Sequence, residues 1–254
     1  MKAKKIIMFV FWLLVFVGVV YVVVRAGSAR DEMACKKYAI QVKVNNAADT
    51  LFYPADIEGI VLTHDSIIGK PYNEINVYTI ETALKESPYI SDVTIFGDLL
   101  GTLHITATQR TPIVRIIDSL NRSFYLDETA HVMPAIRGSS AHVITVSGNI
   151  GITLEQTFSD TLKHRWDALL SCVKYINNDT FLRSQIGQIY VENEKSYILI
   201  PVIGNHKIIL GTPEQPEKRL ERLKIFYQRG MDEEKWENYR SIDLRYKGQI
   251  VCKR

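Results

Sequence analysis

The side chains that could do chemistry are scattered through the sequence. None of the six histidines has the spacing of the two metal ligands in an HExxH helix, so we interpret them as surface or hydrogen-bonded residues. They are His64, His104, His131, His142, His164 and His206. The sequence also has no Gly-x-Ser-x-Gly elbow, phosphate loop or dinucleotide fingerprint. We therefore predict no catalytic residue, no cofactor-binding residue and no metal ligand.

Two shorter patterns and the cysteines lead to the same interpretation. Asp127 and Glu128 are adjacent, so in a strand they point to opposite faces and do not form an acid/base pair. Cys35, Cys172 and Cys252 are far apart and odd in number, which fits neither a disulfide framework nor a zinc site. A bridge between Cys172 and Cys252 would need an oxidising compartment, and we favour unpaired thiols. The protein is predicted to be neither an enzyme nor a cofactor carrier.

The element that must position everything else is the apolar stretch Ile6–Val24. It holds nineteen residues without charge or proline. As a helix it would extend about 28 Å, close to the hydrocarbon core of about 30 Å, so we predict a transmembrane anchor. The alternative is a cleaved signal peptide ending near Gly27-Ser28-Ala29. However, the run is longer than the apolar region of a signal peptide, which has about 7–15 residues, and the charged Arg25 lies between the run and that cleavage site.

Charge patterning excludes one partner class but does not orient the anchor. Lysines precede the apolar run and basic residues also follow it, so the positive-inside rule is nearly balanced. The net charge of +3 and the lack of a basic run with interleaved aromatic residues argue against nucleic acid binding. We divide the chain into a tail (1–5), the anchor (6–24), a linker (25–37) and two folded regions (38–110 and 111–254).

The first folded region shows the pattern of a small α+β domain. Residues 38–44 alternate apolar and polar side chains, as in a half-buried strand. Pro54 suits the first turn of a helix, Asn76 suits the N-cap of a second helix, and Pro88 ends that helix. Two alternating strands follow within 93–107. The predicted order is β-α-α-β-β, with both helices on one face of the sheet.

The second folded region is predicted to be a mixed sheet flanked by two helices. The first helix follows Ser159-Asp160-Thr161, and the mixed charges from Lys218 to Lys224 are typical of a solvated helix face. The predicted strands are Ile113–Ile117, Ser123–Leu126, His142–Ser147, Ile186–Glu192, Ser196–Pro201 and His206–Leu210. The buried helix stripes are Leu162, Trp166, Leu169, Leu170 and Val173, and then Leu220, Leu223 and Tyr227.

The last stretch, residues 241–251, alternates strictly enough to predict one more strand. Ile242, Leu244, Tyr246 and Ile250 would face the core, and the polar residues between them would face water. A final strand that lies at the edge of a sheet can pair with another chain. The alternative is a strand that only closes the core.

Several short motifs, taken in order, resemble the FtsQ/DivIB family of cell-division proteins. The first are Pro88-Tyr89-Ile90-Ser91-Asp92-Val93, Gly101-Thr102-Leu103-His104-Ile105 and Gln109-Arg110-Thr111-Pro112-Ile113-Val114-Arg115. Phe124-Tyr125-Leu126-Asp127, Val132-Met133-Pro134 and Val146-Ser147-Gly148 follow. The resemblance implies that the first region is a POTRA domain and the second is the β domain of this family.

The resemblance also implies a role and partners. The protein would be a single-pass inner-membrane scaffold of the division septum, with a cytoplasmic N-terminus and most of the chain in the periplasm. It would bind FtsB and FtsL, with further contacts to FtsK, FtsW and FtsI. The implied FtsB-binding residues are Asp243, Leu244, Arg245 and Tyr246 by motif, and Lys247, Gly248, Gln249, Ile250 and Val251 by continuity of the predicted strand.

Three residues flank the junction of the two regions. Arg110, Pro112 and Arg115 are predicted to orient the domains through local ion pairs, with partner contact as the alternative. Two other functional classes stay open. A POTRA-type periplasmic chaperone or translocation subunit would normally carry repeated POTRA domains, and an envelope hydrolase would need convergent carboxylates or a nucleophile.

Overall fold

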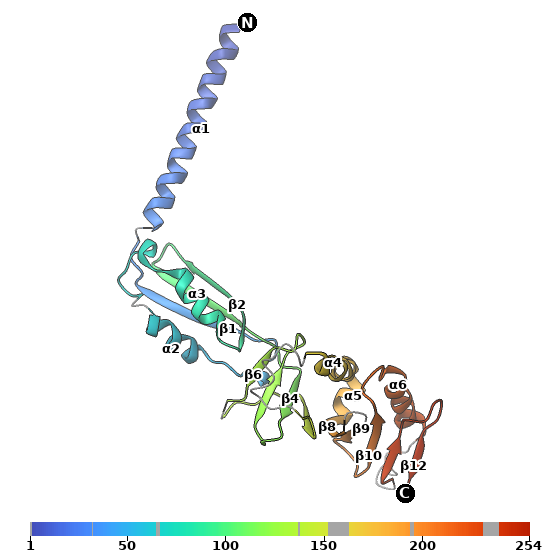
Figure 1. The fold of residues 1–254 in the computed structure, drawn as a ribbon. Helices are drawn as coiled ribbons and strands as arrows, with labels where there is room; N and C mark the ends of the chain where they lie inside the picture. Colours follow the sequence, from blue (N-terminus) through green and yellow to red (C-terminus); the bar gives the residue numbers. More distant parts are fainter. Residues whose placement is uncertain are drawn as a thin grey trace. The chain divides into compact units, whose positions relative to one another are not determined.

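The chain is described by a computed structural model over residues 2–31, 33–64, 67–136, 138–151, 163–193, 196–230 and 239–254 (Figure 1). It divides into two compact units. The first unit comprises Met1–Lys43 and Phe52–Gln109, and the second comprises Val44–Leu51 and Arg110–Arg254. Each unit has its own hydrophobic core.

The first unit begins with the long helix α1, Lys2–Asp31. Its described side chains from Phe11 to Val23 are apolar, apart from Gly18 and the Tyr21 hydroxyl, and all are exposed. Helices with so much exposed apolar surface are unusual in water. Among the described residues, no helix combines the length and apolarity that a membrane crossing requires.

The rest of the first unit confirms the predicted β-α-α-β-β order. Strand β1 (Lys37–Lys43) is followed by helices α2 (Pro54–His64) and α3 (Val77–Lys85), and then by strands β2 (Ile90–Gly97) and β3 (Thr102–Gln109). The sheet order is β1-β3-β2, with β1 parallel and β2 antiparallel to β3. A short 3₁₀ turn, η2 (Tyr72–Glu74), precedes α3.

Local signals at both helices behave as predicted. Pro54 is the first residue of α2, where its missing N–H costs no hydrogen bond. The Asn76 side chain caps α3 by accepting a hydrogen bond of 3.1 Å from the Thr79 N–H. Ile80 and Leu84 then face the core of the unit, next to Ile57 of α2.

A short segment between β1 and α2 belongs to the second unit. Residues 44–51 include the 3₁₀ turn η1 (Ala47–Asp49). The Asp49 carboxylate accepts a 2.7 Å hydrogen bond from the His142 main-chain N–H, and the Asn45 amide donates to the Thr111 hydroxyl at 2.6 Å. The sequence pattern of 38–110 gave no sign of this excursion.

The second unit is built on a nine-stranded mixed sheet of order β12-β11-β10-β9-β8-β7-β4-β5-β6. The pairs β4–β7, β7–β8 and β10–β11 are parallel, and the other neighbours are antiparallel. The mixed sheet is therefore confirmed. The strands are β4 (Val114–Ile117), β5 (Ser123–Leu126), β6 (Val132–Pro134), β7 (Ile144–Gly148), β8 (Ile186–Asn193), β9 (Ser196–Pro201), β10 (Lys207–Gly211), β11 (Ser241–Asp243) and β12 (Val251–Lys253).

The core of this unit lies between the sheet and its helices. Helices α4 (Lys163–Asn178), α5 (Thr180–Gln185) and α6 (Glu217–Ile225) contribute to it, so the described residues hold three helices where the sequence predicted two. The predicted stripes are buried, with Trp166 only 3% exposed. Leu162 and the predicted cap at 159–161 lie outside the described residues.

The prediction of one continuous strand over 241–251 is wrong. The stretch forms two short antiparallel strands, β11 and β12, joined by the loop 244–250. Gly248 adopts a φ of +77°, a conformation that breaks strand geometry and favours glycine. The alternating side chains therefore mark a hairpin, and β11 is paired on both sides, with β10 and with β12.

Candidate functional site

The predicted partner-binding residues are distributed over this C-terminal hairpin. Asp243 ends β11, and its largely buried carboxylate forms a fork with Arg245, whose Nη2 lies 2.6 Å away. The Arg245 main-chain N–H also donates to the Asp243 Oδ1, at 3.0 Å. The hydrogen bonds from the Arg245 side chain hold the pKa of Asp243 below its ordinary value, although burial acts in the opposite direction. The fork fixes the chain as it leaves β11.

This fork predicts an acid sensitivity that Asp243→Asn should remove. A carboxyl whose folded pKa is depressed contributes stability above its unfolded pKa of about 3.9, and this stability is lost as pH falls below that value. Urea unfolding at neutral and acidic pH should show the parent protein losing about 1 kcal/mol more than the variant. Glu221→Gln, on the exposed face of α6, is the matched control. Equal acid sensitivity of parent and Asp243→Asn would contradict the assignment.

Helix α6 holds the start of the loop from the other side. Leu244 is fully buried, and its carbonyl accepts a hydrogen bond from the Arg222 Nη2 at 3.1 Å. The Arg222 Nη1 donates to the Tyr246 carbonyl at 3.0 Å. Arg219 similarly donates to the Leu210 carbonyl at 2.9 Å. The charged run on α6 is therefore not simply a solvated face, and its prediction as such is wrong for these two arginines.

The rest of the loop lies at the surface of the second unit. Tyr246 is 47% exposed, and Lys247, Gly248 and Gln249 are exposed. An open cleft of about 440 Å³ lies between the loop and the end of α6. Its lining combines apolar side chains with two guanidinium groups, and comprises Arg222, Ile225, Phe226, Arg229, Gly230, Gly248, Gln249 and Ile250.

The sequence analysis did not predict that α6 and the turn after it line a cleft. Ile225 is 48% exposed, and an exposed isoleucine beside a buried stripe is a weak signal because single exposed apolar residues are common. Residues 226–230 form a π-helical turn after α6. Such turns are rare and occur frequently at functional sites, but the sequence does not reveal them.

The edge of the sheet is formed by β12. Leu244 donates its main-chain N–H to the Ile209 carbonyl on β10. In a strand, the main-chain groups of successive residues point to opposite sides. The N–H and carbonyl of Asp243, at the end of β11, therefore point toward β12. Asp243 pairs with Val251, and Ser241 pairs with Lys253. The main-chain groups of the first and last residues of β12 therefore point toward β11. Cys252 lies between them, so its N–H and carbonyl point away from the sheet. No described strand pairs with that side.

Two of the three predicted junction residues, Arg110 and Arg115, make side-chain contacts within the second unit, and Pro112 lines the second cleft described below. Arg110 Nη1 lies 3.1 Å from Asp127 Oδ2, and Arg115 donates to the Ser123 hydroxyl at 3.0 Å while stacking 5.8 Å from the Tyr125 ring centroid. Asp127 lies in the turn that follows β5, directly after the predicted strand Ser123–Leu126, whose bounds the structure confirms. These contacts fix local geometry, and the orienting role of the arginines stays a prediction.

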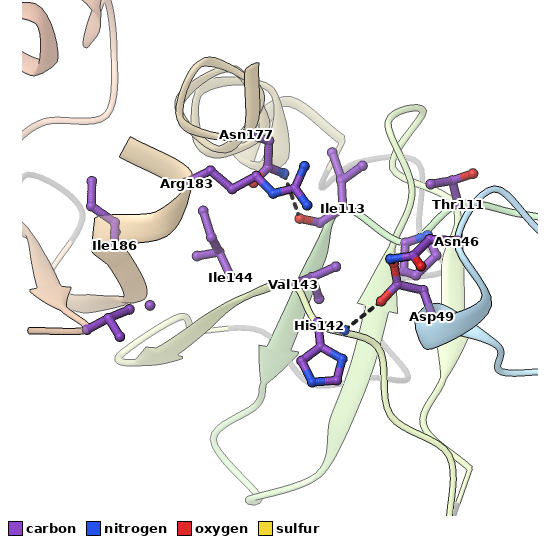
Figure 2. Close-up of a pocket in the computed structure, with 13 residues that line it drawn as sticks. Asn46, Asp49, Thr111, Ile113, His142, Val143, Ile144, Asn177, Arg183 and Ile186 are labelled. Atoms are coloured by element: carbon purple, nitrogen blue, oxygen red, sulfur yellow. Dashed lines mark hydrogen bonds between the residues drawn. The ribbon is translucent and has the colours of Figure 1, made fainter. Parts of the chain in front are cut away.

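A second cleft, of about 600 Å³, lies in the second unit (Figure 2). The Asn177 amide donates to the Ile113 carbonyl at 3.1 Å, and Arg183 projects into the same space. Asp49 bonds the main chain of His142 rather than its imidazole, so these two residues do not form an acid/base dyad. The lining comprises Asn46, Asp49, Thr111, Pro112, Ile113, His142, Val143, Ile144, Asn177, Arg183, Ile186, Gly187 and Val202.

Two histidines outside these clefts bond a neighbouring side chain, and the cysteines are unpaired. His104 lies 2.9 Å from Asp98, and buried His206 bonds the Tyr227 hydroxyl. The three cysteines are free thiols, and burial raises the pKa of Cys172 to about 12. Within the described ranges, no group of three or more His, Cys, Asp or Glu side chains could hold a metal ion.

Comparison with known families identifies both units. Residues 111–253 match the family described as FtsQ/DivIB, C-terminal related, which covers more than half of the chain. The chain belongs to the FtsQ/DivIB family. Residues 33–108 match the POTRA-like domain, which precedes the FtsQ/DivIB match along the chain. The family resemblance predicted from the sequence is confirmed. Comparison with curated proteins gives no match.

Family membership defines the general role. FtsQ/DivIB domains indicate a scaffold role in cell division, in contact with other cell-division proteins at the septal membrane, and the family is generally not enzymatic.

Proposed function

We propose that this protein is a non-enzymatic scaffold of the divisome that captures FtsB, together with FtsL, at its C-terminal edge strand. The observation that carries this proposal is the outward-facing main chain of Cys252 on β12, two residues after Ile250, which lines the cleft formed by α6 and the loop 244–250. An unfilled edge can receive one further strand. The adjoining cleft offers space for the side chains of that partner.

The membrane part of the proposal depends on the apolar run in α1. Residues 6–24 would cross the inner membrane, with 1–5 in the cytoplasm and the linker 25–37 leading to the periplasmic regions 38–110 and 111–254. In support, the backbone of Lys2–Asp31 is one helix. The described apolar side chains are continuous only from Phe11 to Val23, and the sequence supplies the remainder of the run. At the septum, the POTRA domain would contact FtsK, with further contacts to FtsW and FtsI.

Strand pairing alone would give a weak complex. A strand added along β12 would bond the N–H and the carbonyl of Cys252, two hydrogen bonds that contribute about 1 kcal/mol net each, whereas association costs about 4–15 kcal/mol. Side-chain contacts must supply the difference. Tyr246 offers a half-exposed aromatic anchor, and the cleft combines apolar Ile225 with the cationic Arg229. Confinement to one membrane raises the effective concentration of the partner further.

The structure changes which predicted residues would contact the partner. Exposed Tyr246, Lys247, Gly248 and Gln249 keep their proposed role, with Ile250 in the cleft. Asp243 and Leu244 are buried, so they would support the loop from inside the unit and would not contact the partner. The predicted set (Asp243, Leu244, Arg245, Tyr246, Lys247, Gly248, Gln249, Ile250 and Val251) is therefore proposed as a contact loop with its internal support.

A photo-crosslinker at position 247 tests the proposal in dividing cells. Mass spectrometry of the trapped protein should identify FtsB or FtsL. Tyr246→Ala should reduce the trapped amount about tenfold, because truncating an interface aromatic removes a large, rigid contact area. Tyr190→Ala is the matched control, since Tyr190 is 42% exposed on β8 of the same unit. Trapping of an unrelated protein, or equal yields from the two variants, would remove the loop from the mechanism.

A further inference from the structure

Three large aliphatic side chains are exposed in two loops of the POTRA domain. Leu99 and Leu100 form the tip of the β2–β3 hairpin and are 71% and 78% exposed, and Ile68, in the loop after α2, is 60% exposed. Hairpin tips normally carry Gly, Asn, Asp or Ser. We propose that these two loops dock onto the surface of an anionic lipid bilayer. This inference rests on the proposed membrane anchor and adds a second, peripheral contact with the same membrane.

Both loops are hydrogen-bonded to the short segment that follows α1. The Cys35 N–H donates to the Lys70 carbonyl at 2.8 Å, and Cys35 accepts from the Gly69 N–H at 2.7 Å. The Lys36 N–H donates to the Gly101 carbonyl at 2.8 Å. A Cβ at Gly101 would lie 3.1 Å from the Ala34 carbonyl oxygen, so this glycine permits the close approach. The segment therefore ties both tips to the start of the domain.

Chain connectivity keeps these loops close to the proposed anchor. Helix α1 ends at Asp31, and four residues further on, at Cys35, the chain is already bonded to the loop after α2. An extended chain of that length spans at most about 14 Å. The part of α1 beyond Val24 rises about 10 Å, comparable to a headgroup layer of about 5–7 Å on each side of the bilayer. The tips are therefore within reach of the interface.

The hairpin tip is held in a fixed shape that presents both leucines. One carboxylate oxygen of Asp98 accepts hydrogen bonds of 2.8 Å from the Leu100 and Thr102 N–H groups. Its other oxygen lies 2.9 Å from His104 Nε2. These bonds hold the pKa of Asp98 far below its ordinary value, so the carboxylate stays ionised and the turn stays closed. A fixed turn loses little conformational entropy when its tip enters the interface.

Charges around the tips favour an anionic surface. Lys36 and Lys37 are exposed, and Lys70 is partly exposed beside Ile68. Asp98 is engaged by the turn. The other carboxylates in the sequence of these segments are Asp31, Glu32, Asp65 and Glu74, and among the described side chains Glu74 is exposed. Aliphatic tips flanked by lysines match a bilayer with anionic headgroups. We choose the bilayer over a protein partner because the connectivity to α1 fixes these loops near lipid, whatever else is bound.

Fluorescence quenching with the full chain in lipid nanodiscs tests the inference. An environment-sensitive probe is attached at Leu100→Cys, with Cys252→Ser, because Cys35 and Cys172 are fully buried and do not compete. Nitroxide lipids, in nanodiscs with about 30% anionic lipid, should quench this probe about threefold more than a probe at Ile203→Cys. Ile203, 60% exposed in the β9–β10 turn of the second unit, is the matched apolar tip. Adding Leu99→Asp should reduce the quenching to the Ile203 level.

A probe at Val17→Cys within α1 separates the two proposals. Strong quenching at position 17 with equal quenching at positions 100 and 203 would overturn the surface contact and leave the anchor standing. Absence of quenching at position 17 would overturn the anchor, and the surface contact with it. Quenching at position 100 that is unchanged when zwitterionic lipid replaces the anionic lipid would overturn the assigned role of Lys36 and Lys37.

Discussion

Replacing Cys252 with proline is expected to lower the affinity for the captured partner by about tenfold or more. The substitution removes an outward N–H on β12 and leaves a partner carbonyl unpaired, which costs about 1–3 kcal/mol. A tenfold loss corresponds to about 1.4 kcal/mol. Proline is tolerated on an edge strand where its nitrogen faces away from the sheet, so β11–β12 pairing should survive. Titration calorimetry of the full chain with the partner identified by crosslinking measures the effect.

Cys252→Val is the control for this substitution. Valine keeps the main-chain N–H and favours strand geometry, so its affinity should stay within about twofold of the parent, given the small packing change. The melting temperature of both variants reports whether the second unit stays folded. If the proline variant is folded and binds as tightly as the valine variant, the partner does not pair with the edge of β12.

Leu244→Ala is expected to destabilise the second unit by about 2–4 kcal/mol, the usual cost of truncating a fully buried leucine. Leu244 is 0% exposed, in the same core as Trp166 and Leu223. The cavity would also weaken the start of the loop, which Arg222 holds through the Leu244 carbonyl. Denaturant unfolding with a spectroscopic probe in the second unit measures the loss.

Its neighbour two residues away provides the contrast. Tyr246 is 47% exposed, so Tyr246→Ala should cost less than about 1 kcal/mol of folding free energy. The two substitutions should therefore have opposite profiles, with Leu244→Ala acting on stability and Tyr246→Ala on partner capture. Similar destabilisation by both would show that the loop is part of the core and not a contact surface.

The first unit could be predicted almost completely because its determinants are local. Asn76 caps the helix that follows it, and Pro54 starts another, through contacts within one turn of the chain. The alternation in β1 and β3 then assigns their faces. The segment 44–51 could not be predicted, because it packs through Asp49 on His142, 93 residues further along the chain.

The candidate site was only partly predictable for the same reason. Alternation over 241–251 is compatible with one strand or with two strands and a turn, since both place every second residue on the core side. The difference is decided by the positive φ of Gly248, the Asp243–Arg245 fork and the two carbonyls held by Arg222 of α6. Nothing in the sequence around Arg222 distinguished it from an ordinary solvent-exposed arginine on a helix.

The sequence by itself therefore determined the family, the order of elements in the first unit and the location of the apolar run, because periodicity and capping are encoded between near neighbours. Only the tertiary structure decided which strand forms the edge of the large sheet and which loops are tied to the end of α1. Those features arise from hydrogen bonds between residues far apart in the chain, such as Lys36 to Gly101. Strand order and exposure are properties of the assembled sheet, and no short stretch of sequence contains them.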